Sequence, residues 1–263
     1  MNKLKLTKIE TEFAQDGHTY TIGGQLLPGV TSILGIMDKP ALKQWAANRA
    51  GEEIASQWKA GTPYSAEQIE KAIAEAKKAW RKTSKEAKDA GSEAHDWIEK
   101  YLKTRMSGNV GEALRDYKKG QEVVADLPKG EQALKSVNAF LKWEFEVKPE
   151  WLLSEEVLGS VNNLFAGTID AVARIDGKLT IIDFKTSKAI YEEYWLQTAA
   201  YWILLDENLN EGEERPTHRA IVRIPKDGKD VEIVVKENGL KFEIDTFLHL
   251  REVARWYNKV NNK

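Results

Sequence analysis

The stretch Leu164–Ser187, LFAGTIDAVARIDGKLTIIDFKTS, decides the fold of this chain. Asp176-Gly177 lies between two β-rich runs and predicts a two-residue type I′ hairpin, because both turn positions need positive φ. Counting outward from this turn places Asp170 opposite Asp183. In this non-hydrogen-bonded pair the Cβ atoms lie roughly 4.5–5.5 Å apart. Two carboxylates so close repel each other unless a cation lies between them, so the pair predicts a divalent-metal site.

Lys185 follows Asp183 on the same strand face, because strand side chains alternate, and the same register places it opposite Thr168. A lysine beside metal-bound carboxylates supplies a fixed positive charge that can orient an attacking water or stabilise charge on a phosphate. This pattern is typical of phosphodiester cleavage. The alternative is a surface hairpin with a cross-strand salt bridge, since exposed charge pairs are common. The opposed Asp170 favours the metal site.

Five short motifs follow one another between about residues 86 and 206. They are Gly91-x-x-x-His95 on a predicted helix, Ser154-Glu155 opening a strand, Gly167-Thr168-Ile169-Asp170, Ile182-Asp183-Phe184-Lys185-Thr186-Ser187, and Gln197-x-x-x-Tyr201. In this order they resemble the PD-(D/E)XK nuclease superfamily, specifically its RecB-like exonuclease branch. The stretch Leu27–Leu34, followed by Lys39-Pro40 and Trp45, resembles the leader of phage-encoded members. It departs from their Pro-Ser-Val-Thr pattern at Gly29.

The resemblance implies an α/β (α+β) fold, a restriction-endonuclease-like core with a central mixed sheet flanked by helices, plus an N-terminal helical elaboration. We expect one nuclease domain over residues 1–263, with the elaboration at 1–85, the core at 86–236 and a closing helix at 237–263. Local patterns predict helices over 40–59, 65–84, 131–145, 191–205 and 240–260, with a separate helix around His95. They predict strands over 19–25, 151–160, 164–175, 178–186, 219–224 and 231–236. Residues 30–37 fit either element, and residues 107–120 are expected to form a loop. Ser65-Ala66-Glu67-Gln68 is a capping box.

The resemblance also implies the roles of the site residues. The expected ligands of one or two Mg²⁺ or Mn²⁺ ions are His95, Asp170, Asp183 and the backbone carbonyl of Phe184. The expected catalytic residues are Asp170, Asp183, Lys185, Glu155, Gln197 and Tyr201. Oxygen-rich ligation is what these hard cations prefer.

Three of these assignments have alternatives in the sequence. On spacing alone His95 is a structural histidine paired with Glu99, one helical turn away. Of the strand neighbours Glu155 and Glu156, only one can face the site, and a one-residue change of register exchanges them. Gln197 and Tyr201 share one helical face, either to support Lys185 or a phosphate, or simply to pack.

A basic stripe precedes His95 on the predicted helix. Its members, together with two residues after Lys185, are the expected DNA-binding residues: Lys78, Arg81, Lys82, Lys85, Lys88, Thr186 and Ser187. Such a stripe is usually only a solvated helix face. Because the formal net charge of the chain is −2, any DNA contact must nevertheless come from a local cationic patch.

Composition excludes several functional classes. The 263 residues include nine tryptophans, and 42% of them are hydrophobic, which argues against disorder. Without cysteine there is no disulfide, thiolate zinc site, catalytic thiol or iron–sulfur cluster. No Gly-x-x-x-x-Gly-Lys-Ser/Thr motif is present, so ATP is not implied. We find no membrane-spanning run and no signal peptide, and expect a cytoplasmic protein, in the host-cell cytoplasm if it is phage-encoded.

The predicted function is a metal-dependent DNA nuclease, an exonuclease on linear DNA in phage recombination or DNA processing. A structure-specific or restriction-like endonuclease is the alternative, because the same metal core serves both. Two other classes compete: a nucleic-acid-binding protein without catalysis, against which the intact Asp, Asp and Lys set argues, and a non-nuclease metal-binding domain without DNA affinity. DNA is the expected partner, and a homo-oligomer or a phage recombination partner is compatible with the resemblance.

Overall fold

The computed structural model describes residues 4–14, 19–107, 127–237 and 239–260. The chain forms two compact units, one of residues 1–36 with 93–263 and one of residues 37–92. Most of the loop predicted over 107–120 lies outside the described residues. Within the described part of the chain, no helix combines the length and the apolar character needed to cross a membrane.

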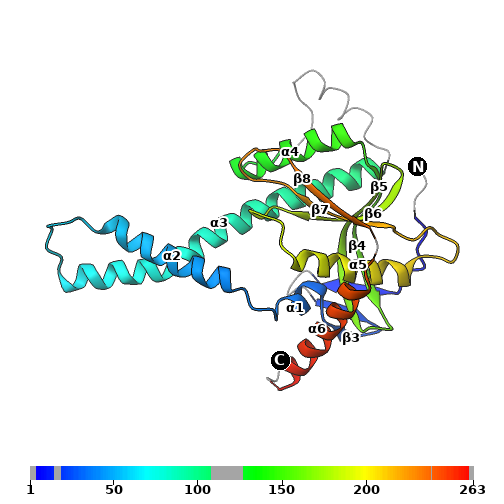
Figure 1. Cartoon of the computed structure of the whole chain (residues 1–263), viewed down its shortest axis with the longest axis horizontal. Coiled ribbons are helices and arrows are strands. Elements are labelled where there is room, and N and C mark those ends of the chain that lie inside the picture. The colour runs from blue at the N-terminus through cyan, green and yellow to red at the C-terminus, as the bar shows by residue number, and fades with distance from the viewer. Residues whose placement is uncertain (1–3, 15–18, 108–126, 238, 261–263) are drawn as a thin grey trace. The chain divides into compact units, whose positions relative to one another are not determined.

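The larger unit is built on a five-stranded sheet in the order β4-β5-β6-β7-β8 (Figure 1). Its strands are β4 (Glu150–Ser160), β5 (Phe165–Ile175), β6 (Lys178–Lys185), β7 (His218–Arg223) and β8 (Glu232–Glu237). The β6–β7 pair is parallel and the other three pairs are antiparallel. The expected central mixed sheet is therefore confirmed.

The predicted hairpin joins β5 to β6. Asp176 and Gly177 have φ of 50° and 75°, as a type I′ turn requires. Pairing begins at Ile175 with Lys178, in the predicted register. It continues to Ala171 and Ile182, and the regular ladder ends there, one step before the two aspartates.

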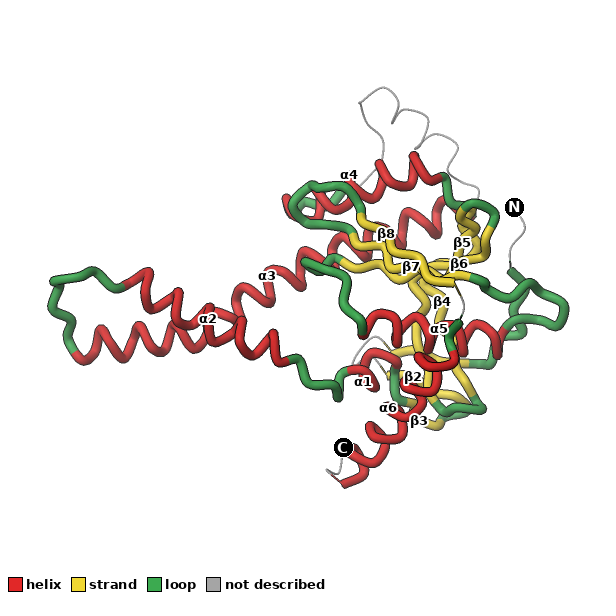
Figure 2. Tube along the Cα trace, in the orientation of Figure 1, coloured by secondary structure: helices red, strands yellow, loops and turns green. Residues whose placement is uncertain are grey.

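Helices cover both faces of this sheet. The part of α3 (Ala66–Met106) from Ala94 onward and α4 (Glu131–Val147) pack on one face, and α5 (Glu193–Asn208) lies along the other (Figures 1 and 2). The first face is rich in aromatic side chains. The Phe140 ring lies 5.7 Å from Phe184 and 6.4 Å from Trp151 between ring centroids. The closing helix α6 (Lys241–Val260) is also confirmed.

A small antiparallel sheet precedes this core and was only partly predicted. It consists of β1 (Thr11–Ala14), β2 (Thr19–Ile22) and β3 (Gln25–Leu27), in that order. Tyr20 and Leu27 pack with Ala166 of β5. The stretch that was compatible with either element contains α1 (Val30–Leu34), a short helix.

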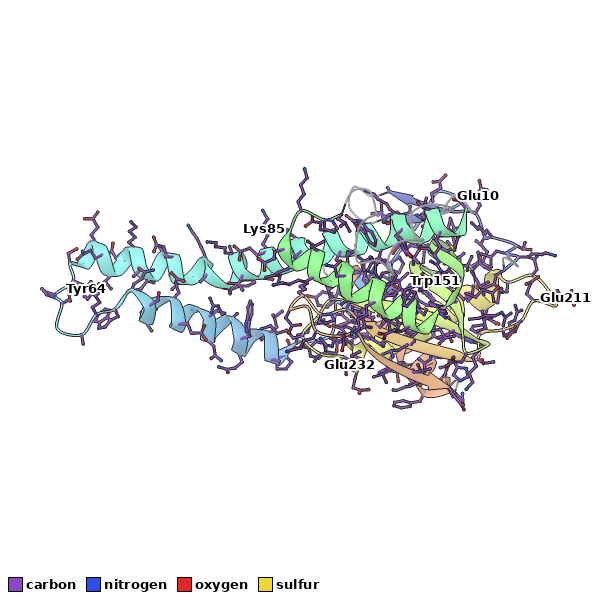
Figure 3. All side chains as sticks on the ribbon, turned by 90° about the horizontal axis from the view of Figure 1, so that it is seen from above. Glu10, Tyr64, Lys85, Trp151, Glu211 and Glu232 are labelled. Carbon is purple, nitrogen blue, oxygen red and sulfur yellow. The ribbon has the colours of Figure 1, made fainter. Side chains whose placement is uncertain are left out.

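The unit of residues 37–92 contains two helical segments. The first is α2 (Pro40–Gln57), which has proline in its first turn, as predicted, and buries none of its residues. The second is the beginning of α3, and its predicted capping box is confirmed: Ser65 N donates to Gln68 Oε1 at 2.8 Å, and Gln68 N donates to Ser65 Oγ at 3.2 Å. Between these segments the Trp58 ring stacks on Tyr64 (labelled in Figure 3) with centroids 4.8 Å apart.

The predicted break between a helix over 65–84 and a separate helix around His95 is wrong. A single helix, α3, runs from Ala66 to Met106. The intervening sequence is rich in Ala, Lys and Glu, which are good helix formers. Gly91 alone interrupts it, and one glycine costs a helix only about 1 kcal/mol relative to alanine.

One buried carboxylate links three elements of the larger unit. Glu144 of α4 accepts hydrogen bonds from the Tyr101 hydroxyl at 2.7 Å and from Trp151 Nε1 at 2.9 Å. Arg105 Nε lies 3.0 Å from the same carboxylate, whose side chain is only 3% exposed. Three donors and one charge are thus satisfied together inside the core.

We expect Glu144→Ala to lower the free energy of unfolding by about 2–4 kcal/mol, because a half-buried cation and two neutral donors lose their partner. Urea unfolding monitored by tryptophan fluorescence measures this. Glu131→Ala is the matched control, since Glu131 on the same helix forms only an exposed ion pair with Lys135. Equal stability of the two variants would contradict the assignment.

Candidate metal centre and active site

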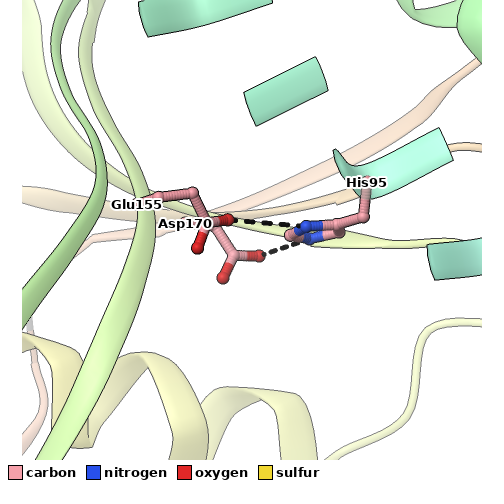
Figure 4. A group of neighbouring side chains, drawn as sticks. All are labelled: His95, Glu155 and Asp170. Atoms are coloured by element: carbon pink, nitrogen blue, oxygen red, sulfur yellow. Dashed lines mark hydrogen bonds and ion pairs between the residues drawn. The ribbon is translucent and has the colours of Figure 1, made fainter. Parts of the chain in front are cut away.

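Three side chains from three elements converge beside the middle of β4 and β5: His95 of α3, Glu155 of β4 and Asp170 of β5 (Figure 4). One ligand atom from each lies within 4.8 Å of the other two. His95 Nε2 is 3.2 Å from Asp170 Oδ2, and His95 Nδ1 is 3.5 Å from Glu155 Oε1. The three residues are among those predicted from the sequence.

The backbone of β4 brings Glu155 to this position. The flanking pairs, Ser154 with Ala171 and Glu156 with Ile169, place Glu155 level with Asp170 on the neighbouring strand. Glu155 has φ of 48°, a left-handed conformation that costs a non-glycine residue roughly 1–2 kcal/mol. Its neighbour Glu156 instead forms an ion pair with Lys8 at 2.5 Å. Between the two glutamates, the geometry therefore favours Glu155.

Asp170 is held by the strand on its other side. Its Oδ2 accepts a hydrogen bond from the backbone N–H of Phe184 at 2.9 Å, just past the end of the regular β5–β6 ladder. Three residues earlier, a Cβ on Gly167 would lie 2.9 Å from Val30 and 3.2 Å from Leu204. Glycine at this position lets α1 and α5 approach β5 closely.

A second chain of contacts begins at Asp183, which is fully buried. Lys185 Nζ lies 2.7 Å from its carboxylate and donates to Oδ1. Lys185 also donates to Gln197 Oε1 at 3.1 Å, and Gln197 Nε2 donates to the Tyr201 hydroxyl at 2.6 Å. All four residues were predicted at the site. The Tyr201 contact fixes the Gln197 amide so that its oxygen faces the lysine.

Tyr194 is a site neighbour that was not predicted from the sequence. The Lys185 ammonium lies 4.9 Å from the centroid of its ring, within the range of a cation–π interaction. Tyr194 precedes Gln197 by three residues on α5, so the two share a helical face. That spacing from Gln197 was the feature of the sequence that could have identified Tyr194 as a neighbour of the site.

Burial and mutual charge shift the pKa values of the three convergent residues. Burial opposes the charge of His95, but Asp170 and Glu155 outweigh it and raise the His95 pKa to about 9. Burial and the Asp170 charge raise the pKa of Glu155 to about 8. Burial would also raise the pKa of Asp170, yet His95, Lys185 and the Phe184 N–H together hold it below its usual range.

The Asp183–Lys185 pair is shifted in the same way. Burial and Asp170 raise the pKa of Asp183 to about 7, although Lys185 acts against this shift. Burial disfavours the charge of Lys185, but Asp183 and Asp170 outweigh it and raise its pKa. The lysine is therefore a protonated ammonium at neutral pH.

The donor set fits a hard divalent cation. Two carboxylates and one imidazole offer the oxygen-rich ligation that Mg²⁺ and Mn²⁺ accept. Asp183 is buried beside this group, and its carboxylate is paired with the Lys185 ammonium at 2.7 Å. Asp183 nevertheless lies outside the group of three. Its place as a ligand, and that of the Phe184 carbonyl, stay predictions.

The predicted DNA-binding residues lie in two places. Lys78, Arg81, Lys82, Lys85 and Lys88 are exposed on α3 within the unit of residues 37–92. Thr186 and Ser187 follow directly after β6 and are half-buried. The Ser187 hydroxyl donates to the Ala189 carbonyl at 2.7 Å, which occupies its hydrogen.

In EDTA, we expect the protein to lose stability as the pH rises from about 6 to 9. A raised pKa means that the folded state holds a proton which the unfolded state has released. The His95 contribution is complete below 6.5 and is lost towards pH 9, and those of Glu155 and Asp183 are lost towards pH 8 and 7. Each group titrating alone changes the free energy of unfolding by at most about 1.4 kcal/mol per pH unit.

Thermal unfolding in EDTA and in Mn²⁺ measures this dependence. The increase in Tm caused by Mn²⁺ should grow with pH, because protons and the cation compete for the same side chains. Glu155→Gln should flatten the EDTA profile. A Tm that is constant between pH 6 and 9 in EDTA would contradict the predicted shifts.

Comparisons with solved structures find only distant matches to this chain. No curated protein matches the chain. Among solved structures, the protein SSO0001 is 16% identical, with a TM-score of 0.31 over 46% of this chain and 57% of its own. A putative exonuclease from Eubacterium rectale is 14% identical, with a TM-score of 0.35 over 62% and 64%. The alkaline exonuclease from Laribacter hongkongensis is 12% identical, with a TM-score of 0.28 over 84% and 97%.

This chain thus spans less than two thirds of the length of the first two of these structures. The family comparison covers much more of this chain. The model of the PD-(D/E)XK nuclease superfamily matches residues 54–262, which include all three convergent residues, Asp183, Lys185 and the α5 residues of the site. The mixed sheet with flanking helices is the restriction-endonuclease-like arrangement expected of such proteins. The chain belongs to the PD-(D/E)XK nuclease superfamily.

Proposed function

We propose that this protein is a divalent-metal-dependent deoxyribonuclease of the RecB-like branch, an exonuclease that hydrolyses linear DNA in phage recombination or DNA processing. The observation that carries the proposal is the convergence of His95, Glu155 and Asp170 beside the buried Asp183–Lys185 pair. Superfamily membership supports the nuclease chemistry. The preference for linear DNA and the phage setting rest on the order of the sequence motifs.

One group of residues would bind a cation, and another would bind the phosphate. His95, Glu155 and Asp170 would bind Mg²⁺ or Mn²⁺. Asp183 would be a further carboxylate ligand. When bound, the ion supplies a Lewis acid that neutralises charge on the phosphate and the leaving oxygen.

Lys185 is the polar group best placed to meet the phosphate. Without a bound cation, Asp183 and Asp170 raise its pKa and keep it protonated, so that it can donate to a phosphate oxygen or orient a water. Gln197 fixes the position of the ammonium, and Tyr201 fixes that of Gln197. These are the two roles expected of Lys185 from the sequence, to orient a water or to stabilise charge on a phosphate.

The first test uses linear and covalently closed circular DNA, single- and double-stranded, with Mg²⁺, Mn²⁺ or EDTA. We expect cleavage of linear DNA only, with EDTA abolishing it. Asp183→Ala and Lys185→Ala should each reduce cleavage at least about 100-fold, because each removes charge at the reacting phosphate. Lys188→Ala is the matched control, since Lys188 is exposed just beyond the site.

Other outcomes identify the alternatives. Cutting of closed circles would identify an endonuclease. A protein that binds DNA but cleaves none of these substrates with either ion would be a nucleic-acid-binding protein without catalysis. A metal-binding protein without DNA affinity would remove DNA from the proposal altogether.

The basic stripe of α3 is the second part of the proposal, as a DNA-backbone contact. Residues 77–88 contain six basic side chains and one acidic one. None of these six pairs with an acid that the structure describes, whereas Lys43, Lys103 and Lys135 on the surface all do. Lys85, labelled in Figure 3, is one of them. Unpaired cations along one helix face suit a row of phosphates.

We expect Lys82→Ala and Lys85→Ala to weaken DNA binding, because each removes a phosphate contact. Each should reduce the slope of log affinity against log salt by about 0.9. Binding to linear duplex DNA in Ca²⁺, measured by fluorescence anisotropy across a salt series, tests this. Lys43→Ala, whose lysine pairs with Asp38, is the control. Unchanged slopes would leave the stripe as a solvated helix face.

A further inference from the structure

A tyrosine of the N-terminal sheet reaches the face of β5 that carries Asp170. The hydroxyl of Tyr20 on β2 lies 3.1 Å from Thr168 Oγ1. Thr168 precedes Asp170 by two residues on β5, so both side chains point to the same face. The separation along the strand is roughly 6.8 Å. Tyr20 thus lies beside the metal centre without being part of its ligand group.

The two hydroxyls satisfy each other only in part. Each hydroxyl has one hydrogen, and one hydrogen bond between them uses one hydrogen. In the described part of the structure neither hydroxyl makes another hydrogen bond. One donor of the pair is therefore free. A phosphate oxygen, which only accepts, is its natural partner.

Tyr20 is also electrostatically coupled to the centre. Burial raises the pKa of Tyr20, and the charges of Glu155 and Asp170 raise it further, although the contact with Thr168 acts in the opposite direction. The phenol therefore stays protonated at neutral pH and can donate. Two ligand-type carboxylates are close enough to affect it.

Two neighbours fix the ring of Tyr20. It packs against Phe13 with centroids 4.9 Å apart. It also lies against Gly29, where an added Cβ would come within 2.9 Å of Tyr20 Cε2. Gly29 has φ of −76° and ψ of 151°, which any residue adopts, so glycine is needed here for space and not for backbone conformation.

Gly29 is also the position at which the leader departs from the pattern of phage-encoded members. It is the N-cap of α1 and provides no side-chain cap. A serine could cap the helix. In this chain the Tyr20 ring occupies the space that such a side chain would need.

We propose that Tyr20 is a substrate-contacting residue whose hydroxyl donates a hydrogen bond to the DNA phosphate next to the one that is cleaved. Thr168 donates to Tyr20 and positions the hydroxyl, and Gly29 makes room for the ring. The neighbouring phosphate is assigned because Thr168, which holds the Tyr20 hydroxyl, lies two residues along β5 from Asp170. This inference rests on the proposed nuclease function.

The test measures kcat/KM on linear DNA for wild type, Tyr20→Phe, Thr168→Val, Gly29→Ala and the two double variants that combine Tyr20→Phe with each of the others. Tyr20→Phe should lose about tenfold or more, since a hydrogen bond to a charged oxygen is removed while the ring is kept. Thr168→Val and Gly29→Ala should each lower kcat/KM as single variants. Combined with Tyr20→Phe, neither should lower kcat/KM below that of Tyr20→Phe itself, because both act through the same hydroxyl.

Two further measurements separate this role from a structural one. The Tm and the Mn²⁺ affinity of Tyr20→Phe should match those of wild type. Tyr64→Phe, whose hydroxyl bonds only to the backbone of residues 57 and 59, should retain full activity.

The proposal is overturned if Tyr20→Phe cleaves within twofold of wild type, or if it weakens Mn²⁺ binding as much as activity, because the hydroxyl would then act on the ligands. It is also overturned, together with the proposed function, if wild type cleaves no DNA. An active wild type with an unaffected Tyr20→Phe removes this inference alone.

Discussion

The structure of the site depends on one electrostatic constraint: three carboxylates, two of them buried and one half-buried, lie together with only two basic groups beside them. Asp170, Glu155 and Asp183 meet His95 and Lys185 within a few hydrogen-bond lengths. Desolvation makes each unpaired negative charge costly. The pKa values of His95, Glu155 and Asp183 are therefore raised, and the cluster binds more protons than the same groups would in water. A fold that only had to be stable would replace such a cluster by apolar side chains, which often stabilises a protein.

The backbone fixes these charges in place before any ligand arrives. The β5–β6 ladder ends one pair before the aspartates, and Asp170 accepts the Phe184 N–H there with its side chain. Glu155 reaches the same level only through a left-handed backbone conformation. Both features are unfavourable for a regular sheet, and both aim a carboxylate at the same point. Such pre-positioning is what a metal centre needs, because ligands that must first be ordered bind more weakly.

The features predicted correctly from the sequence are those that depend on residues close to one another along the chain. The Asp176-Gly177 turn and the Ser65 capping box need only neighbouring residues, and the register followed from the turn. The antiparallel sheet β1–β3 depends on pairing between short strands with weak patterns, and the break predicted before His95 overestimated one glycine. Tyr20 could not be found from its own surroundings in the sequence, because its partner Thr168 lies 148 residues away. The sequence showed that Gly29 departs from the family pattern. The reason for that departure became clear only from the Tyr20 ring that lies against Gly29.

The net charge of this cluster also connects binding of a cation with binding of the substrate. With all five groups charged, the cluster carries one excess negative charge and would repel a phosphate, and the raised pKa values show that protons reduce this excess when no cation is present. A divalent cation held by His95, Glu155 and Asp170 would compete with those protons, including the one on His95. The carboxylates would then be neutralised by the cation and Lys185 together, and an approaching phosphate would no longer meet a negative site. Metal and DNA should therefore bind cooperatively, with the protons of the cluster as their common competitor.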